Sequence, residues 1–234
     1  MIRSLRNGCP SSPVKDLDFG FLVPYIPQLV QASKLTFAIG VLSFGAALLI
    51  AVCVGLLRSG NLPRTLDGLI GAYVEIFRGT PLLIQLFFIY YGLPSFGIMF
   101  EPVTAAVMGL SLNSGAYMSE VVRASVKAVG NGQYEAALCL GYKPLQVHRH
   151  IILPQAFKIA LPTLMNYFST MIKETSLVSV LSIAEITRIG NQIYARTLSP
   201  FEIYLTIGAI YFCMTWSVAL ISKRLERGTS KWTP

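Results

Sequence analysis

The amino-acid sequence predicts an all-α integral membrane protein with about five transmembrane helices. Of its 234 residues, 53% are hydrophobic and only 13% are charged, which is about half the charged fraction of a typical soluble domain. Several uncharged stretches are each long enough, at ~1.5 Å per residue, to cross a ~30 Å hydrocarbon layer. These stretches are Leu35–Leu57, Gly79–Phe100, Pro102–Ser119 and Ile203–Ser222.

The predicted helices follow from these stretches in chain order. A further apolar run, Ile159–Ala184, is long enough to span the membrane but is interrupted by Lys173 and Glu174. The five helices are expected at residues 28–57, 67–93, 102–123, 157–182 and 201–222. No cleavable signal peptide is expected, because Pro10 and Pro13 occur where its apolar segment should be.

The net charge of +8 is distributed unevenly across the predicted membrane. Eleven Lys and Arg residues lie on the side that holds the 58–64 loop, the 123–158 segment and the C-terminal end, against five on the opposite side. Positively charged loops stay in the cytoplasm, so the N-terminus is predicted outside and the C-terminus inside. Residues 1–24 then form an outer tail, 25–223 the transmembrane domain and 224–234 a cytoplasmic tail. The basic excess reflects topology, and no nucleic-acid partner is expected.

The most specific pattern lies between the third and fourth predicted helices. Three residues separate Glu135-Ala-Ala from Gly141, nine residues separate Gly141 from Ile151, and one residue separates Ile151 from Leu153-Pro154. This spacing resembles the EAA motif of bacterial ATP-binding-cassette importer permeases. The resemblance implies a type I importer permease fold with a coupling helix at about residues 133–141, seated in a groove of a cytoplasmic ATPase. The implied coupling residues are Glu135, Ala136, Ala137 and Gly141.

The residue types in this segment suit a docking helix. Alanines let another protein surface approach closely, and a glutamate in the first turn would complement the helix dipole. Gly141 would allow a sharp exit from the helix, as glycine does at C-terminal caps. The alternative for these residues is an ordinary surface helix with a glutamate near its start.

Three further segments narrow the resemblance to the polar amino acid permeases of the histidine, glutamine and cystine group. Glu75–Pro94, Leu112–Arg123 and Lys173–Val180 are similar to that group's second-, third- and fourth-helix segments, and the resemblance covers about residues 35–225. Glu174 stands where the group usually has an aspartate. The resemblance implies a bacterial inner-membrane importer of a polar or charged amino acid. Its partners would be an ATPase dimer, a second permease subunit, identical or related, and an external solute-binding protein.

The energy source is expected to lie outside this chain. The sequence contains no Gly-x-x-x-x-Gly-Lys-Ser/Thr phosphate loop, so ATP and Mg²⁺ are expected on the partner ATPase and no cofactor on this chain. No catalytic triad or acid–base pair is apparent, and the four cysteines and two histidines have no metal or disulfide spacing. We therefore expect a transport subunit and not an enzyme.

Polar residues inside the predicted spans are candidates for a substrate pathway. Charged groups deep in a span cost several kcal/mol unless they face a cavity or a partner, and adjacent residues on a helix point apart. Glu174 could thus meet a substrate's ammonium group, while salt bridges between helices or subunits are the alternative for both Lys173 and Glu174. Asn113, Tyr117 and Glu120 fall at i, i+4 and i+7 and so share one polar face of the third helix, which could equally line a pathway or pack. The candidate pathway residues are Asn113, Ser114, Tyr117, Glu120, Lys173, Glu174, Thr175 and Ser176.

Two other patterns concern packing. Ser111, Gly115 and Ser119 form a stripe of small residues that predicts close helix contact in lipid. Glu75 and Arg78 could pair at i and i+3, and Pro81 predicts a kink, but the sequence assigns this stretch no chemistry.

Two other functions are compatible with a membrane protein of this kind, a secondary transporter and a membrane scaffold. A secondary transporter built from inverted repeats would tend to show two matching halves, and five unequal spans do not divide that way. A membrane scaffold would bind partners without moving a solute. Neither alternative explains the full spacing of the motif. For an importer, alternating access is expected, with the loops near 94–101 and 183–199 meeting the binding protein.

Overall fold

A computed structural model describes residues 18–60 and 62–230, and every regular element among them is helical. Most of the predicted outer tail lies outside the described residues, but positions 20–24 of it are helical and continuous with α1. The elements are η1 (Gly20–Tyr25), α1 (Ile26–Leu57), α2 (Arg64–Gly79), α3 (Leu82–Phe87), η2 (Phe88–Gly92), η3 (Leu93–Phe96), α4 (Pro102–Ala128), α5 (Asn131–Cys139), α6 (Pro144–Val147), η4 (His148–Ile152), α7 (Leu153–Glu174), η5 (Thr175–Leu181), α8 (Ile186–Thr197) and α9 (Pro200–Ser230).

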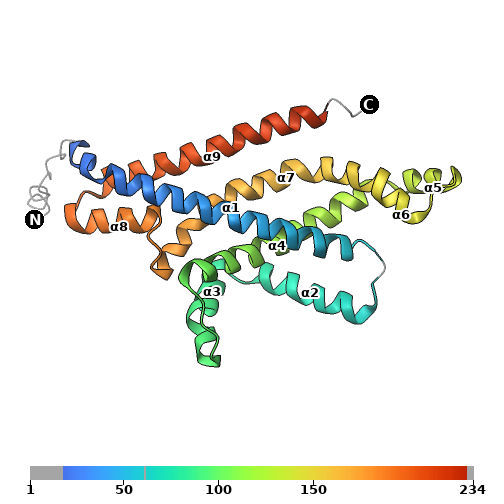
Figure 1. Cartoon of the computed structure of the whole chain (residues 1–234), viewed down its shortest axis with the longest axis horizontal. Coiled ribbons are helices and arrows are strands. Elements are labelled where there is room, and N and C mark those ends of the chain that lie inside the picture. The colour runs from blue at the N-terminus through green and yellow to red at the C-terminus, as the bar shows by residue number, and fades with distance from the viewer. Residues whose placement is uncertain (1–17, 61, 231–234) are drawn as a thin grey trace, which may run out of the picture.

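Four long helices, α1, α4, α7 and α9, form an elongated bundle (Figure 1). α4 packs against both α1 and α7, and α9 packs against α7. The predicted stripe of small residues lies at the α1–α4 contact. A Cβ atom added at Gly115 would lie 2.9 Å from the Ile50 side chain, and the Ser111 hydroxyl lies 3.2 Å from the Ser43 carbonyl. Small side chains therefore let these two backbones approach closely, as expected.

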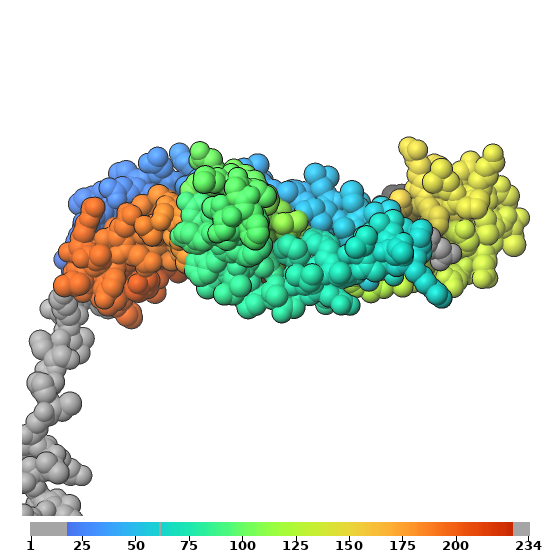
Figure 2. Space-filling view, turned by 90° about the horizontal axis from the view of Figure 1, so that it is seen from below, coloured from blue at the N-terminus to red at the C-terminus, as the bar shows by residue number. Residues whose placement is uncertain are grey.

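The expectation of one continuous helix at 67–93 is wrong, because this segment forms two helices. α2 ends at Gly79, α3 begins at Leu82, and the two segments are bent by 109°. Pro81 has no backbone N–H to continue the helical bonds, which accounts for a break at this point. Residues 82–96, which we call the arm, stand out from the bundle (Figures 1 and 2).

The two ends of the bundle differ. α8 lies beside the start of α1 at one end, which we call the α8 end, while α5 and α6 project beyond the long helices at the other, the α5 end (Figure 1). The turn between α1 and α2 also lies toward the α5 end. The α1–α2 connection and the segment that links α4 to α7 therefore share one end of the bundle.

The surface of the bundle is apolar along two of the long helices. Gly20–Leu57 and Pro200–Glu226 are long and apolar enough to cross a membrane, and the bent pair α2–α3 adds a third candidate. The other two expected spans correspond to α4 and α7–η5, which carry most of the polar candidate residues. Large apolar side chains that are more than half exposed include Leu42, Leu49, Phe212, Trp216 and Ile221. Hydrocarbon is the solvent that suits such a surface.

Candidate functional site

A polar cavity of about 320 Å³ opens where the α2–α3 bend meets α4 and α7. Three parts of the chain that are distant in sequence supply its walls. The lining residues are Thr80, Pro81, Leu82, Asn113, Ser114, Tyr117, Tyr167 and Glu174. The structure thus brings together Asn113, Ser114, Tyr117 and Glu174 from the predicted pathway set, while their role in transport stays a prediction.

Two side-chain amides hold the bend beside this cavity. Asn113 Nδ2 donates to the Phe77 carbonyl at 3.0 Å and to Gln85 Oε1 at 3.1 Å. Gln85 Nε2 donates to the carbonyls of Phe77 and Thr80 at 2.9 and 3.1 Å. Carbonyls left free by a helix break are costly in a membrane unless side chains satisfy them. Sequence analysis missed Gln85, although an amide in the uncharged run just after Pro81 was the available signal.

Tyrosine side chains line one wall of the cavity. The Tyr117 hydroxyl donates to the Arg78 carbonyl at 2.9 Å, which ties the middle of α4 to the end of α2. The Arg78 guanidinium lies over the Tyr117 ring, 5.4 Å from its centroid. The ring centroids of Tyr117 and Tyr167 are 6.3 Å apart. The Arg78 guanidinium therefore lies beside the cavity, and the Glu174 carboxylate is part of the cavity lining.

Glu174 is the last residue of α7, and its neighbours point elsewhere. Glu174 is half-buried in the cavity wall and forms no ion pair with any described residue. Lys173 is exposed on another face of the helix, as adjacent helical positions require. Thr175 is fully buried, and its hydroxyl donates to the Ile172 carbonyl at 2.6 Å. Lys173, Thr175 and Ser176 are not among the lining residues.

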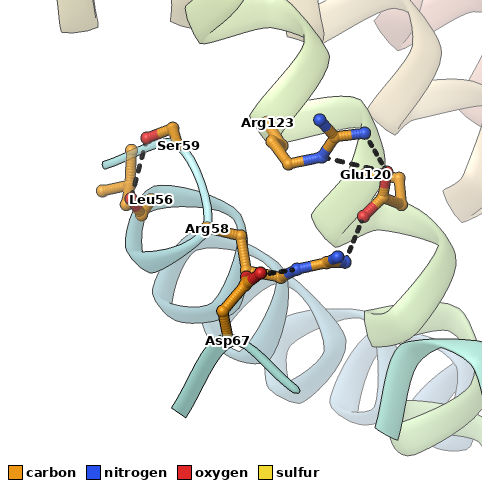
Figure 3. Close-up of polar contacts among 6 residues, drawn as sticks. All are labelled: Leu56, Arg58, Ser59, Asp67, Glu120 and Arg123. Carbon is orange, nitrogen blue, oxygen red and sulfur yellow. Dashed lines mark hydrogen bonds and ion pairs between the residues drawn. The ribbon is translucent and has the colours of Figure 1, made fainter. Parts of the chain in front are cut away.

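Glu120, also predicted for the pathway, lies outside the cavity in an ion network (Figure 3). Its Oε1 accepts a hydrogen bond from Arg58 Nη1 at 2.7 Å. Its Oε2 accepts from Nε and Nη2 of Arg123, the former at 3.0 Å. Arg58 Nε also lies 3.5 Å from Asp67 Oδ1. This network joins α4 to the end of α1 and to the start of α2. These residues are far apart in the sequence, so their contact could not be predicted from it.

The predicted coupling segment forms a short helix, α5, at the α5 end. The helix begins at Asn131, two residues before the expected start, and Glu135 therefore lies in its second turn. The expectation that Glu135 complements the helix dipole from the first turn is wrong. Glu135 and Ala136 are exposed, whereas Ala137 is buried against neighbouring segments of the same chain. Gly141 has φ +84° just after the helix, the left-handed conformation that glycine adopts without strain.

A second buried carboxylate lies at the α8 end. Glu185 is fully buried and caps α8, accepting hydrogen bonds from the backbone N–H groups of Thr187 and Arg188 at 2.9 and 2.8 Å. The Tyr211 hydroxyl of α9 donates to it at 2.8 Å. Burial raises the pKa of Glu185 above its ordinary value, although these hydrogen bonds oppose the rise. The contact fastens α8 to α9, and the sequence analysis did not single it out.

Metal binding has no candidate in the described part of the chain. No group of three or more His, Cys, Asp or Glu side chains within residues 18–60 and 62–230 is placed to hold an ion. The three described cysteines, Cys53, Cys139 and Cys213, are exposed and unpaired with one another. Chemistry in this site thus comes from carboxylate, amide, hydroxyl and guanidinium groups.

Residues 47–231 match the family described as the inner membrane component of binding-protein-dependent transport systems. The chain belongs to this family. It is therefore a transport component and not an enzyme, and it resides in the inner membrane. The family match covers the cavity, α5 and the Glu120 network together.

Individual relatives of this transport component agree with the family match. It is 38% identical to the probable amino-acid ABC transporter permease protein PatM of Vibrio harveyi, over 89% of this chain and 93% of that protein. It is 36% identical to the glutamine transport system permease protein GlnP of Escherichia coli, over 90% and 96% of the two chains. A solved amino acid ABC transporter with histidines matches its fold with a TM-score of 0.84 at 37% identity, over 90% and 98% of the two chains. The type I importer permease fold is thereby established for this chain.

Proposed function

We propose that this chain is the permease subunit of an ATP-driven importer that moves a polar or charged amino acid across the inner membrane. The observation that carries the proposal is the polar cavity at the α2–α3 bend, within the part of the chain predicted to span the membrane. Similarity to amino-acid permeases, including one for glutamine, supports the substrate class. So does the similarity to a solved amino acid ABC transporter.

The cavity has the chemistry that an amino acid requires. Glu174 offers a carboxylate that forms no ion pair with any described residue, and a carboxylate binds an ammonium or another cationic group through charge-assisted hydrogen bonds. Asn113, Ser114 and the two tyrosines add neutral donors and acceptors. The volume of about 320 Å³ lies at the lower end of the range for small-molecule sites. A single amino acid is a suitable occupant.

The orientation in the membrane follows from the charge distribution. With the α5 end in the cytoplasm, most Lys and Arg residues of the connecting segments lie inside, as the positive-inside rule requires. The N-terminus is then outside and the C-terminus inside. The loop near 94–101 and the 183–199 segment, which contains α8, would face the external solute-binding protein. A second permease subunit would cover the exposed Lys173, which lipid alone would not accommodate.

Coupling to the partner ATPase would act through α5. Glu135 and Ala136 present an exposed surface, while Ala137 anchors the helix in an apolar cluster with α7 and the end of α4. Movement of α5 is therefore passed to α4 and α7, and these two helices form walls of the cavity. ATP and Mg²⁺ would bind the ATPase, and closing of the ATPase dimer would open the cavity to the outer side.

Uptake into proteoliposomes tests this function. The vesicles would contain this chain, its partner permease and ATPase subunits and its binding protein, and a panel of radiolabelled amino acids would identify the substrate. Glu135→Arg reverses a charge on the exposed face of α5 and should abolish uptake and the stimulation of ATPase activity by loaded binding protein. Arg64→Glu, an equally exposed charge reversal at the start of α2, is the control and should retain both activities.

Other results would refute parts of the proposal. Uptake that proceeds equally without the ATPase would identify a secondary transporter. Uptake that survives deletion of this chain would identify a scaffold. If Glu135→Arg keeps normal stimulation of the ATPase, α5 is not the coupling helix, even where import itself is observed.

A further inference from the structure

An apolar groove runs along three of the long helices in the half of the bundle nearest the α5 end. Its volume is about 260 Å³, and every lining residue is an Ala, Val, Leu or Phe of α1, α4 or α7. On α7 the groove extends from Leu153 to Leu164, about 16 Å at ~1.5 Å per residue. The groove and the polar cavity share no lining residue among those described. The groove is therefore a separate feature of the fold.

Small side chains on α7 create this groove. Ala156 and Ala160, one turn apart, line it at positions where larger side chains would fill the space between α7 and α1. α1 and α7 diverge towards the α5 end, and α4 packs against both (Figure 1). At the rim, the side chains of Val52 and Phe157 are 40% and 58% exposed. The groove thus opens to the outside of the bundle, where lipid is the solvent.

Hydrocarbon is the filler that this location supplies. The lining residues lie within or directly beside the spans predicted at 28–57, 102–123 and 157–182. Water finds no hydrogen-bonding partner on an apolar wall, whereas an acyl chain restores the van der Waals contacts that an empty groove forfeits. A length of about 16 Å is close to half of the ~30 Å hydrocarbon layer, which is the depth of one leaflet. The groove therefore matches one acyl chain of a lipid from the leaflet at the α5 end.

Two cations lie beside the α5 end of the groove, at the level expected for the headgroup of such a lipid. Lys127 directly follows the lining residue Val126 near the end of α4, and Arg149 precedes Leu153 by four residues, about 6 Å along the chain's helical axis. Both side chains are exposed, and neither forms an ion pair with any described residue. Long basic side chains extend along a helix towards the membrane surface, and basic clusters there recognise anionic headgroups.

We propose that this groove binds one acyl chain of an anionic phospholipid from the cytoplasmic leaflet, with Lys127 and Arg149 holding the phosphate of the headgroup. The leaflet follows from the proposed orientation, but lipid binding itself goes beyond the import function. α4 and α7 form walls of both the groove and the polar cavity. A bound chain therefore supports the two helices through which movement of α5 is proposed to reach the cavity.

Lipid binding to the purified permease–ATPase complex tests the proposal. The complex in detergent would be titrated with phosphatidylglycerol, or with phosphatidylethanolamine that carries the same acyl chains, and bound lipid would be counted by native mass spectrometry. Each cation near an anionic headgroup contributes about fivefold in affinity, so wild type should bind phosphatidylglycerol at least about tenfold more tightly. Phosphatidylglycerol with a photoreactive acyl chain should label residues 48–56 or 153–164.

Matched variants separate the groove from the general surface. Val52→Phe fills the groove and should weaken binding of phosphatidylglycerol about tenfold. Val41→Phe is the control and should bind as wild type, because Val41 lies on the same helix, is 42% exposed and does not line the groove. The double variant Lys127→Gln, Arg149→Gln should bind the two lipids equally. Arg64→Gln, which removes an exposed cation at the start of α2, should keep the preference.

Several outcomes would overturn the inference without touching the import function. Equal binding of phosphatidylglycerol by Val52→Phe and Val41→Phe would show that the groove holds no acyl chain. A preference that survives in the double variant would show that other cations hold the headgroup. Loss of the assembled complex in Val52→Phe, seen by size-exclusion chromatography, would assign the groove to a contact with the second permease subunit. Absence of ATP-dependent uptake by wild type, in contrast, would refute the import function itself.

Discussion

Replacing Glu120 with glutamine is expected to weaken the contact among α1, α2 and α4 near the α5 end. Glu120 accepts one hydrogen bond from Arg58 at 2.7 Å and two from Arg123, all charge-assisted. Glutamine keeps the size of the side chain and one acceptor oxygen, but it removes the negative charge and the second acceptor. One of the two guanidinium groups then meets the amide NH₂ group, which cannot accept a hydrogen bond, in place of a carboxylate oxygen.

The size of the effect follows from the partial burial of the network. A hydrogen bond to a charged group contributes about 1.5–3 kcal/mol, while a fully exposed ion pair contributes at most about 1 kcal/mol. The side chains of Arg58 and Glu120 are 21% and 20% exposed, so we expect a loss of about 2 kcal/mol. For a chain of this size, that corresponds to a fall in melting temperature of about 4–8 °C.

Thermal melting of the purified permease–ATPase complex in detergent measures this effect. Glu101→Gln removes the same charge from an exposed position at the other end of α4, where Glu101 forms no ion pair with any described residue, and should change the melting temperature by less than about 2 °C. A double-mutant cycle with Arg58→Ala would isolate the pairwise energy. Equal melting temperatures for Glu120→Gln and Glu101→Gln would refute the reasoning.

Two further substitutions test packing and burial. Gly55→Ala should destabilise the complex by about 1–3 kcal/mol through overpacking, because the new Cβ would lie 2.6 Å from the Ser119 carbonyl, whereas Gly45→Ala meets nothing within 4 Å and should be tolerated; equal melting would contradict the close α1–α4 contact. Burial raises the pKa of Glu185, so the folded protein holds this proton more tightly than the unfolded chain. The stability that Glu185 contributes is then greatest below its ordinary pKa, about 4.5, and is lost as the pH rises through the raised pKa. The advantage of wild type over Glu185→Gln in melting temperature should therefore shrink as the pH increases, and a difference independent of pH would count against this.

Features that depend on local composition and spacing could be predicted from the sequence. Long uncharged stretches predicted the spans, because crossing a hydrocarbon layer requires about 20 apolar residues in any context. The part of the motif from Glu135 to Gly141 predicted a short helix followed by a turn, and the left-handed conformation at Gly141 agrees. Pro81 predicted a kink in the second span. Each of these inferences needs only neighbouring residues.

The candidate site depended on contacts between distant residues. Sequence periodicity grouped Asn113, Tyr117 and Glu120 on one face, but only the packing of α4 against the α1–α2 turn directs Glu120 to Arg58 and leaves the other two at the cavity. Likewise, Gln85 is visible in the sequence only as an amide in an uncharged run, and only the fold brings it to the carbonyls of the bend.

The sequence by itself therefore determined that this protein crosses a membrane, roughly where each helix lies, and the helix that is proposed to meet an ATPase. Only the tertiary structure decided that the second span bends by 109° and that a cavity forms beside the bend. The physical reason is that membrane insertion depends on the summed hydrophobicity of a continuous segment. The fate of one carbonyl or one carboxylate depends instead on which partner, often tens of residues away in the chain, the fold brings within hydrogen-bonding distance.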